Sequence, residues 1–301
     1  MNRTNLLAVV TCAVFSLFAY VASQAIADEA GESATKPAVV VSDAKSDLYV
    51  SDLDIQKIKW AELRKSDGNG VIVEFKSVKD YLHNDKKKTA SAKQQFIDSQ
   101  LGQPRFDAKQ FLKLTTAEQL IEIRETPGHG GVDIYKDIVI KSDPKFMKEF
   151  RMVWPSVNAT CASASCHGAP EGKGELKFFP RGGPNNDKVD YTNYLILNLW
   201  ETKKGLQLID RDYPEDSLVL QYGLPLDKAK DKHKVTPRWK ATFTDTKKGS
   251  NYAKFEQFIK DLDGTRTPNY GTEYQPPVGK LNSGSKALDD EVEEEESDDR
   301  D

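Results

Sequence analysis

The sequence predicts a mainly α-helical fold, with a helical domain at about residues 143–263 behind a small, mostly helical region. Apolar side chains recur on one helical face over residues 143–157 and again over residues 250–262, which predicts two amphipathic helices. Ahead of this domain, Thr115-Thr-Ala-Glu118 is a capping box and marks the start of another helix. The apolar run at residues 71–75 follows a glycine-containing turn and predicts a short strand.

Local start signals define the remaining elements. Ser51 is a predicted N-cap, and Asp143-Pro144 places a proline at the first position of the helix that precedes the cysteines. We expect a helical turn at residues 77–82 and an exposed, lysine-rich segment at residues 86–88. The expected helices cover residues 51–63, 92–101, 107–112, 115–123, 143–157, 191–200, 214–222 and 250–262.

The N-terminus has the pattern of a secretory signal peptide. Arg3 supplies the positive charge, residues 6–19 the apolar run, and Ala25-Ile-Ala27 a small-residue cleavage site. A retained membrane anchor is the alternative. With cleavage, the chain divides into a signal peptide (1–27), a linker (28–47), an N-terminal helical region (48–140), a helical domain (141–264) and a disordered acidic tail (265–301).

Charge is unevenly distributed along the chain. Residues 289–301 contain ten acidic side chains and one arginine, a net charge of −9, whereas the whole chain carries −4. The remainder is therefore mildly basic, at +5. The tail either attracts a basic partner or keeps the protein in solution.

Residues 161–168, Cys161-Ala-Ser-Ala-Ser-Cys166-His167-Gly168, contain the two cysteines outside the predicted signal peptide. Two cysteines with a histidine directly after the second are typical of covalent c-type haem attachment. Each thiol bonds one vinyl group, and the histidine binds the iron. The usual gap is two residues, whereas this motif has four.

The residues alone leave two alternatives for this motif. One is a local disulfide between Cys161 and Cys166 in an exported domain, with His167 on the surface. The other is a metal site, but zinc requires further sulfur or nitrogen ligands, and the other histidines do not have zinc-ligand spacing.

The pattern from residue 143 to 263 resembles a c-type cytochrome domain, with amphipathic helices at both ends and the haem motif after the first. The widened C-x4-C-H motif and the segment Pro214-Glu-Asp-Ser-Leu218 are also similar to a group of secreted bacterial proteins. The resemblance implies a cytochrome c-like helical domain and one haem c, with Cys161 and Cys166 in thioether bonds and His167 as the proximal iron ligand.

The resemblance also implies a methionine or histidine ligand from the loop before the closing helix. No methionine follows the motif, and the one histidine there is His233, which is therefore the candidate distal ligand. The alternatives are a solvated histidine between Lys232 and Lys234, and a five-coordinate iron. Met147 and Met152 precede the motif and are expected in helix packing or on the surface.

Together these observations predict an exported, periplasmic monohaem c-type cytochrome that transfers electrons, a carrier rather than an enzyme. We assign no catalytic residue, and we expect a redox partner protein, no nucleic acid and no stable membrane span after signal cleavage. Two other functions stay open: a haem-free binding or scaffold module with a Cys161–Cys166 disulfide, and a haem sensor or peroxidase-like enzyme.

Overall fold

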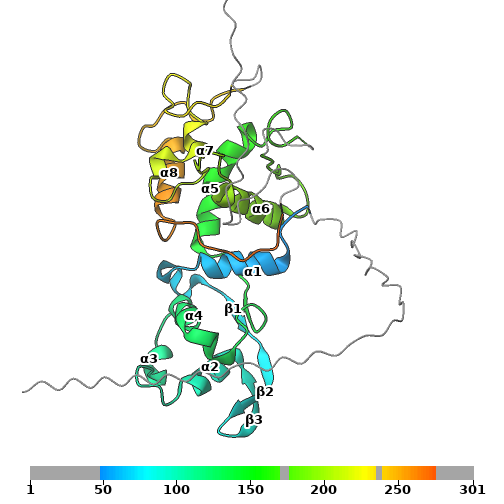
Figure 1. The fold of residues 1–301 in the computed structure, drawn as a ribbon, viewed down its shortest axis with the longest axis vertical. Coiled ribbons are helices and arrows are strands. Elements are labelled where there is room, and N and C mark those ends of the chain that lie inside the picture. The colour runs from blue at the N-terminus through cyan, green and yellow to red at the C-terminus, as the bar shows by residue number, and fades with distance from the viewer. Residues whose placement is uncertain (1–47, 170–175, 235–238, 276–301) are drawn as a thin grey trace, which may run out of the picture. The chain divides into compact units, whose positions relative to one another are not determined.

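Helices and short antiparallel strands together build the protein (Figure 1). The computed structural model describes residues 48–169, 176–234 and 239–275. Its helices are α1 (Asp52–Ala61), α2 (Ala92–Gln100), α3 (Ala108–Phe111), α4 (Thr116–Glu125), α5 (Lys145–Thr160), α6 (Asn186–Leu199), α7 (Leu218–Gln221) and α8 (Asn251–Lys260). Its strands are β1 (Val73–Phe75), β2 (Ser77–His83), β3 (Lys86–Ser91) and β4 (Ile138–Ile140), and its 3-10 turns are η1 (Lys65–Gly70), η2 (Pro127–Gly131) and η3 (Pro214–Asp216).

The prediction of a mainly α, cytochrome c-like fold is wrong, because the chain has mixed α and β character. Helix accounts for 42% and strand for 10% of the structure, and the strands form two two-stranded antiparallel sheets. In one sheet β1 pairs with β4, with Val73 opposite Ile140 and Phe75 opposite Ile138. Strand β4 was not expected, since three apolar residues in a row are too short a signal to distinguish from a loop.

The second sheet replaces the helical turn expected at residues 77–82, whereas the lysine-rich segment at residues 86–88 is exposed as expected but lies in strand β3. Strands β2 and β3 form a hairpin in which His83 pairs with Lys86. Asn84 and Asp85 make the turn with φ angles of 51° and 59°. Asparagine and aspartate tolerate this left-handed backbone better than most residues, and such turns match the twist of paired strands.

Three helix starts follow the sequence signals, whereas α5 begins at Lys145 with Pro144 as its N-cap rather than as its first helical residue. The Ser51 side chain accepts a hydrogen bond from the Asp54 backbone, and the Asp54 carboxylate accepts one from the Ser51 backbone, so both members of a capping box are present. The predicted box of Thr115 and Glu118 forms in the same way. The Ser250 side chain caps α8.

Two hydrophobic cores lie on either side of α1, which contributes to both. In α1, Ile58 packs into a C-terminal core built mainly from α5, α6, α7 and α8. Two positions later, Trp60 packs into an N-terminal core with α2, α4 and β4. Figure 1 shows α1 between these groups of elements. The helix therefore links the two cores through its opposite faces.

Ion pairs fix the helices of the C-terminal core. On α5, the Arg151 Nε donates to the Asp190 carboxylate of α6 at 2.7 Å, and its guanidinium also contacts Asp143 and Asp187. The Asp190 side chain is fully buried, and this burial raises the pKa of its carboxyl. These contacts hold α5, whose C-terminal end leads into the cysteine motif.

Glu62, the residue that ends α1, forms a buried ion pair with Arg211. The Arg211 Nη2 lies 2.5 Å from Glu62 Oε1, and the two side chains are 1% and 0% exposed. The hydroxyls of Tyr194 and Tyr270 donate to the same carboxylate oxygen, at 2.6 and 2.5 Å. Burial holds the pKa of both phenols well above the usual value, so they remain proton donors.

We expect Glu62→Gln to lower the free energy of unfolding by about 3–5 kcal/mol, because it leaves the buried Arg211 without its anionic partner. Urea denaturation measures the loss. The control is Glu74→Gln, which breaks an exposed pair with Lys141 and should change stability by less than about 1 kcal/mol. Equal stability of the two variants would contradict the role assigned to Glu62.

Candidate functional site

The cysteine motif forms a closed loop at the C-terminal end of α5. The Cys161 backbone N–H still donates to Val157, which ends the helix. The His167 N–H then donates back to the Cys161 carbonyl at 2.9 Å, and the Gly168 N–H donates to the Ser163 carbonyl at 3.0 Å. The four residues between the cysteines are thus taken up in a turn, and His167 lies beside Cys161 despite the widened gap.

Gly168 is required by the close approach of two backbone segments in this loop. A Cβ atom at position 168 would lie 1.9 Å from the Ala162 carbonyl oxygen and 2.9 Å from that of Ser163. Real side chains do not reach such distances without displacing the backbone. The glycine after His167 therefore has a structural reason independent of any ligand.

Hydrogen bonding fixes the tautomer of His167. Its Nδ1 lies 3.2 Å from the Leu176 carbonyl oxygen, which can accept a hydrogen bond but cannot donate one, so Nδ1 carries the proton. The neutral imidazole that makes this bond carries its lone pair on Nε2, the nitrogen that binds a metal. The backbone adds a further tie, because the Phe178 N–H donates to the His167 carbonyl at 2.9 Å.

Cys161 and Cys166 are both free thiols and both line one cavity of about 290 Å³. The Cys161 Sγ lies 3.6 Å from the hydroxyls of Thr160 and Thr242, which are 2.6 Å from each other. Burial raises the pKa of the Cys161 thiol, although the two hydroxyls oppose this, so the thiol is protonated at neutral pH.

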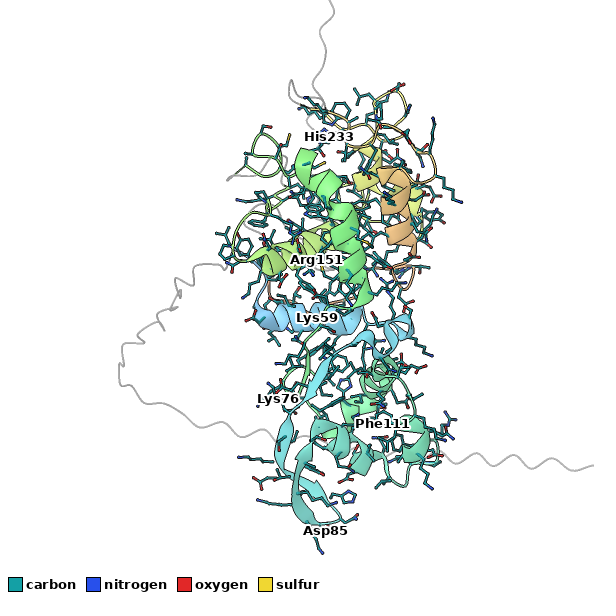
Figure 2. The ribbon with its side chains drawn as sticks, turned by 180° about the vertical axis from the view of Figure 1, so that it is seen from behind. Lys59, Lys76, Asp85, Phe111, Arg151 and His233 are labelled. Carbon is teal, nitrogen blue, oxygen red and sulfur yellow. The ribbon has the colours of Figure 1, made fainter. Side chains whose placement is uncertain are left out.

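His233 joins the motif in the same cavity. It lies on the loop from residue 224 to 242, whose ends meet where the Phe243 N–H donates to the Gly223 carbonyl at 2.9 Å. The centroids of the His167 and His233 rings are 6.0 Å apart, although the residues are 66 positions apart in sequence. Figure 2 shows His233 beyond the C-terminal end of α5, far from Lys59 on α1.

The His233 ring also has a defined tautomer. Its Nδ1 lies 2.7 Å from the Lys234 carbonyl oxygen, so the neutral ring carries its lone pair on Nε2. The side chain is half-buried, whereas those of Lys232 and Lys234 are exposed. His233 is therefore less exposed than its two lysine neighbours but still partly accessible to solvent.

Two imidazoles at this separation suit a single metal ion between them. With metal–nitrogen bonds of about 2.0 Å, ring centroids on opposite sides of one ion are about 6 Å apart. The donor set of two such nitrogens and two thiols in one cavity fits a covalently attached haem. Among the described residues, no group of three or more His, Cys, Asp and Glu side chains is placed to hold a metal ion by itself.

The remaining candidate ligands lie elsewhere. Met147 is fully buried in the C-terminal core, and the side chain of Met152 is 72% exposed. His83 lies in the β2–β3 hairpin beside Asn84, and the His129 Nδ1 contacts the Ile123 carbonyl. None of these four side chains lines the cavity.

The structure adds residues to the site that the sequence did not single out. Tyr222 and Trp239 line the cavity, and the ring of each contacts His233. Thr242 contacts Cys161 from the segment before α8. Tyr222 follows α7, inside the helix expected at residues 214–222. Trp239 and Thr242 come from a stretch without apolar periodicity, and the sequence there does not indicate which residues they contact.

Comparison with known protein families, curated proteins and solved structures finds no match to the chain. The resemblance to c-type cytochromes therefore rests on the sequence motif and pattern alone. No helix in the described ranges is long and apolar enough to cross a membrane. The predicted signal peptide and linker lie outside those ranges, as do residues 276–301 of the predicted disordered tail. Residues 265–275 of that tail are described, and Tyr270 and Tyr274 are buried in the C-terminal core.

We expect Gly168→Ala to lower the free energy of unfolding by about 1–3 kcal/mol, because the new methyl group collides with the Ala162 carbonyl. Urea denaturation measures this loss, and faster amide exchange at His167 would locate it in the motif loop. Gly183→Ala is the matched control, since a Cβ at position 183 meets no atom within 4 Å. A stable Gly168→Ala variant with unchanged exchange would show that the loop tolerates the side chain.

Proposed function

We propose that the chain is an exported monohaem c-type cytochrome that transfers single electrons. The observation that supports the proposal is that the rings of His167 and His233 lie 6.0 Å apart, centroid to centroid, in the wall of one cavity that both thiols also line. A local disulfide would not require a second histidine there. Nor would it require both rings to keep a lone pair on Nε2.

In this proposal the cysteines form the covalent attachment. The thiol of each cysteine would add across one haem vinyl group: the sulfur would bond one carbon and the thiol proton would go to the other, with no net oxidation or reduction. The protonated Cys161 thiol supplies both atoms. Both thiols must be reduced beforehand, and the structure has no disulfide between Cys161 and Cys166.

His167 and His233 would hold the iron of a bound haem through Nε2, because the Nδ1 of each ring is already bonded to a backbone carbonyl. The carbonyls of Leu176 and Lys234 orient the two rings through Nδ1. The haem supplies one-electron chemistry when bound. Two protein ligands leave no open position for a substrate, which favours an electron carrier over a peroxidase-like enzyme.

The first test is covalent haem attachment in a host that matures c-type cytochromes. We expect one haem per chain that remains bound in acid–acetone, and loss of all bound haem in the double variant Cys161→Ala/Cys166→Ala. Mass spectrometry of each single variant should show one thioether in place of two. Cys12→Ala, in the predicted signal peptide, is the control and should leave attachment unchanged. A colourless protein without free thiols would instead support the disulfide-bonded binding module.

The second test concerns the sixth iron ligand. In the reduced protein, His233→Ala should convert the low-spin absorption spectrum to a high-spin one and allow carbon monoxide to bind, because it opens the sixth position. His83→Ala, in the β2–β3 hairpin, is the control and should leave the spectrum unchanged. A wild-type protein that binds carbon monoxide as fast as His233→Ala would support a sensor or peroxidase-like enzyme.

A further inference from the structure

The two histidines are held in very different ways. The backbone of His167 is tied at its N–H and at its carbonyl, to Cys161 and Phe178, in addition to the ring contact with Leu176. The ring of His233 bonds the carbonyl of its own neighbour, Lys234. A bond to the next residue orients the ring on its loop but does not fix the ring relative to the rest of the protein.

Two aromatic rings contact the His233 ring: that of Tyr222, at the end of α7, and that of Trp239, six positions after His233 on the same loop. The Tyr222 ring meets the His233 ring edge to face, with centroids 5.3 Å apart and an angle of 89°. The Trp239 ring lies nearly parallel to it, with centroids 6.4 Å apart and an angle of 20°. Tyr222 is anchored because its N–H continues α7, bonding Leu218 at 2.8 Å, and because it packs against the C-terminal core.

We propose that Tyr222 and Trp239 are positioning residues for His233, and that they determine how readily an uncharged diatomic molecule takes its place on the iron. This inference rests on the proposed haem site. The two rings restrict the positions of the His233 imidazole to those that face His167. Without these two rings the His233 imidazole adopts more orientations. Its Nε2 is then placed to bind the iron in a smaller fraction of molecules.

A competing ligand then binds more readily, because its apparent affinity depends on the fraction of chains in which the sixth position is open. Carbon monoxide is a suitable probe, since it is uncharged and small enough for a cavity of about 290 Å³. The effect differs from that of His233→Ala. Truncating the ring of Tyr222 or Trp239 weakens the bond between His233 and the iron without removing the histidine. Absorption spectra should therefore show a mixture of low-spin and high-spin iron.

The experiment uses the full haem-loaded chain and the variants Tyr222→Leu and Trp239→Leu. Each should raise the rate of carbon monoxide binding to the reduced protein by roughly three- to tenfold, because an aromatic pair contributes that much to an equilibrium. Tyr222→Phe and Trp239→Phe keep a ring in place and should remain within about twofold of wild type. Tyr213→Leu is the surface control, at a tyrosine that is 59% exposed and outside the cavity.

The outcomes separate this inference from the proposed function. If both leucine variants bind carbon monoxide at the wild-type rate while His233→Ala binds it faster, the positioning role is wrong and the ligand assignment stands. If haem is attached but His233→Ala changes nothing, both the assignment and this inference fail. Absence of covalent haem overturns the proposed function itself. Circular dichroism checks that each variant is folded, and the two leucine variants test the two rings independently.

Discussion

The buried pair of Glu62 and Arg211 is the contact on which the C-terminal half of the structure depends. It joins the end of α1 to a segment 149 positions later in the chain. Removing two opposite charges from water is costly unless they meet in good geometry with their other hydrogen-bonding groups satisfied. Here Tyr194, Tyr270 and Asn198 supply most of those partners, although the Arg211 Nε has none. A different packing of α1 against the segment with Arg211 would leave these buried charges without their partners, which would be costly.

This constraint extends to the candidate site through the chain that follows Arg211. The Asp210 N–H donates to the hydroxyl of Ser217, which is fully buried at the start of α7. Helix α7 then ends at Tyr222, in the cavity wall, and Gly223 begins the loop that carries His233. A Cβ at position 223 would lie 2.5 Å from the ring of Phe243, so the two ends of that loop meet in van der Waals contact. The position of His233 is thus set from both ends of its loop by the folded core.

How much of this is predictable from the sequence depends on the range of the interactions. Helix starts such as Ser51 and Thr115 are specified within four residues, and their capping boxes form as expected. The β2–β3 hairpin was missed because its turn, Asn84-Asp85, lacks the glycine of the usual signal. Strand β4 has no local signal, since its partner β1 lies more than 60 residues earlier. The mixed fold class was therefore beyond what periodicity could predict.

The same distinction divides the candidate site in two. The half with Cys161, Cys166 and His167 is contained in eight consecutive residues and is stabilised by its own backbone bonds. The bonds that close this loop join residues near its two ends. Two more residues between the cysteines than in the usual motif therefore still leave His167 beside Cys161. A widened gap between the cysteines is therefore compatible with the function of the motif.

The half with His233 depends on tertiary contacts with Tyr222 and Trp239, and no sequence pattern indicates either residue. In the proposed haem site, the core around Glu62 and Arg211 therefore matters for the position of His233, whereas the motif loop with both cysteines is held by its own backbone bonds.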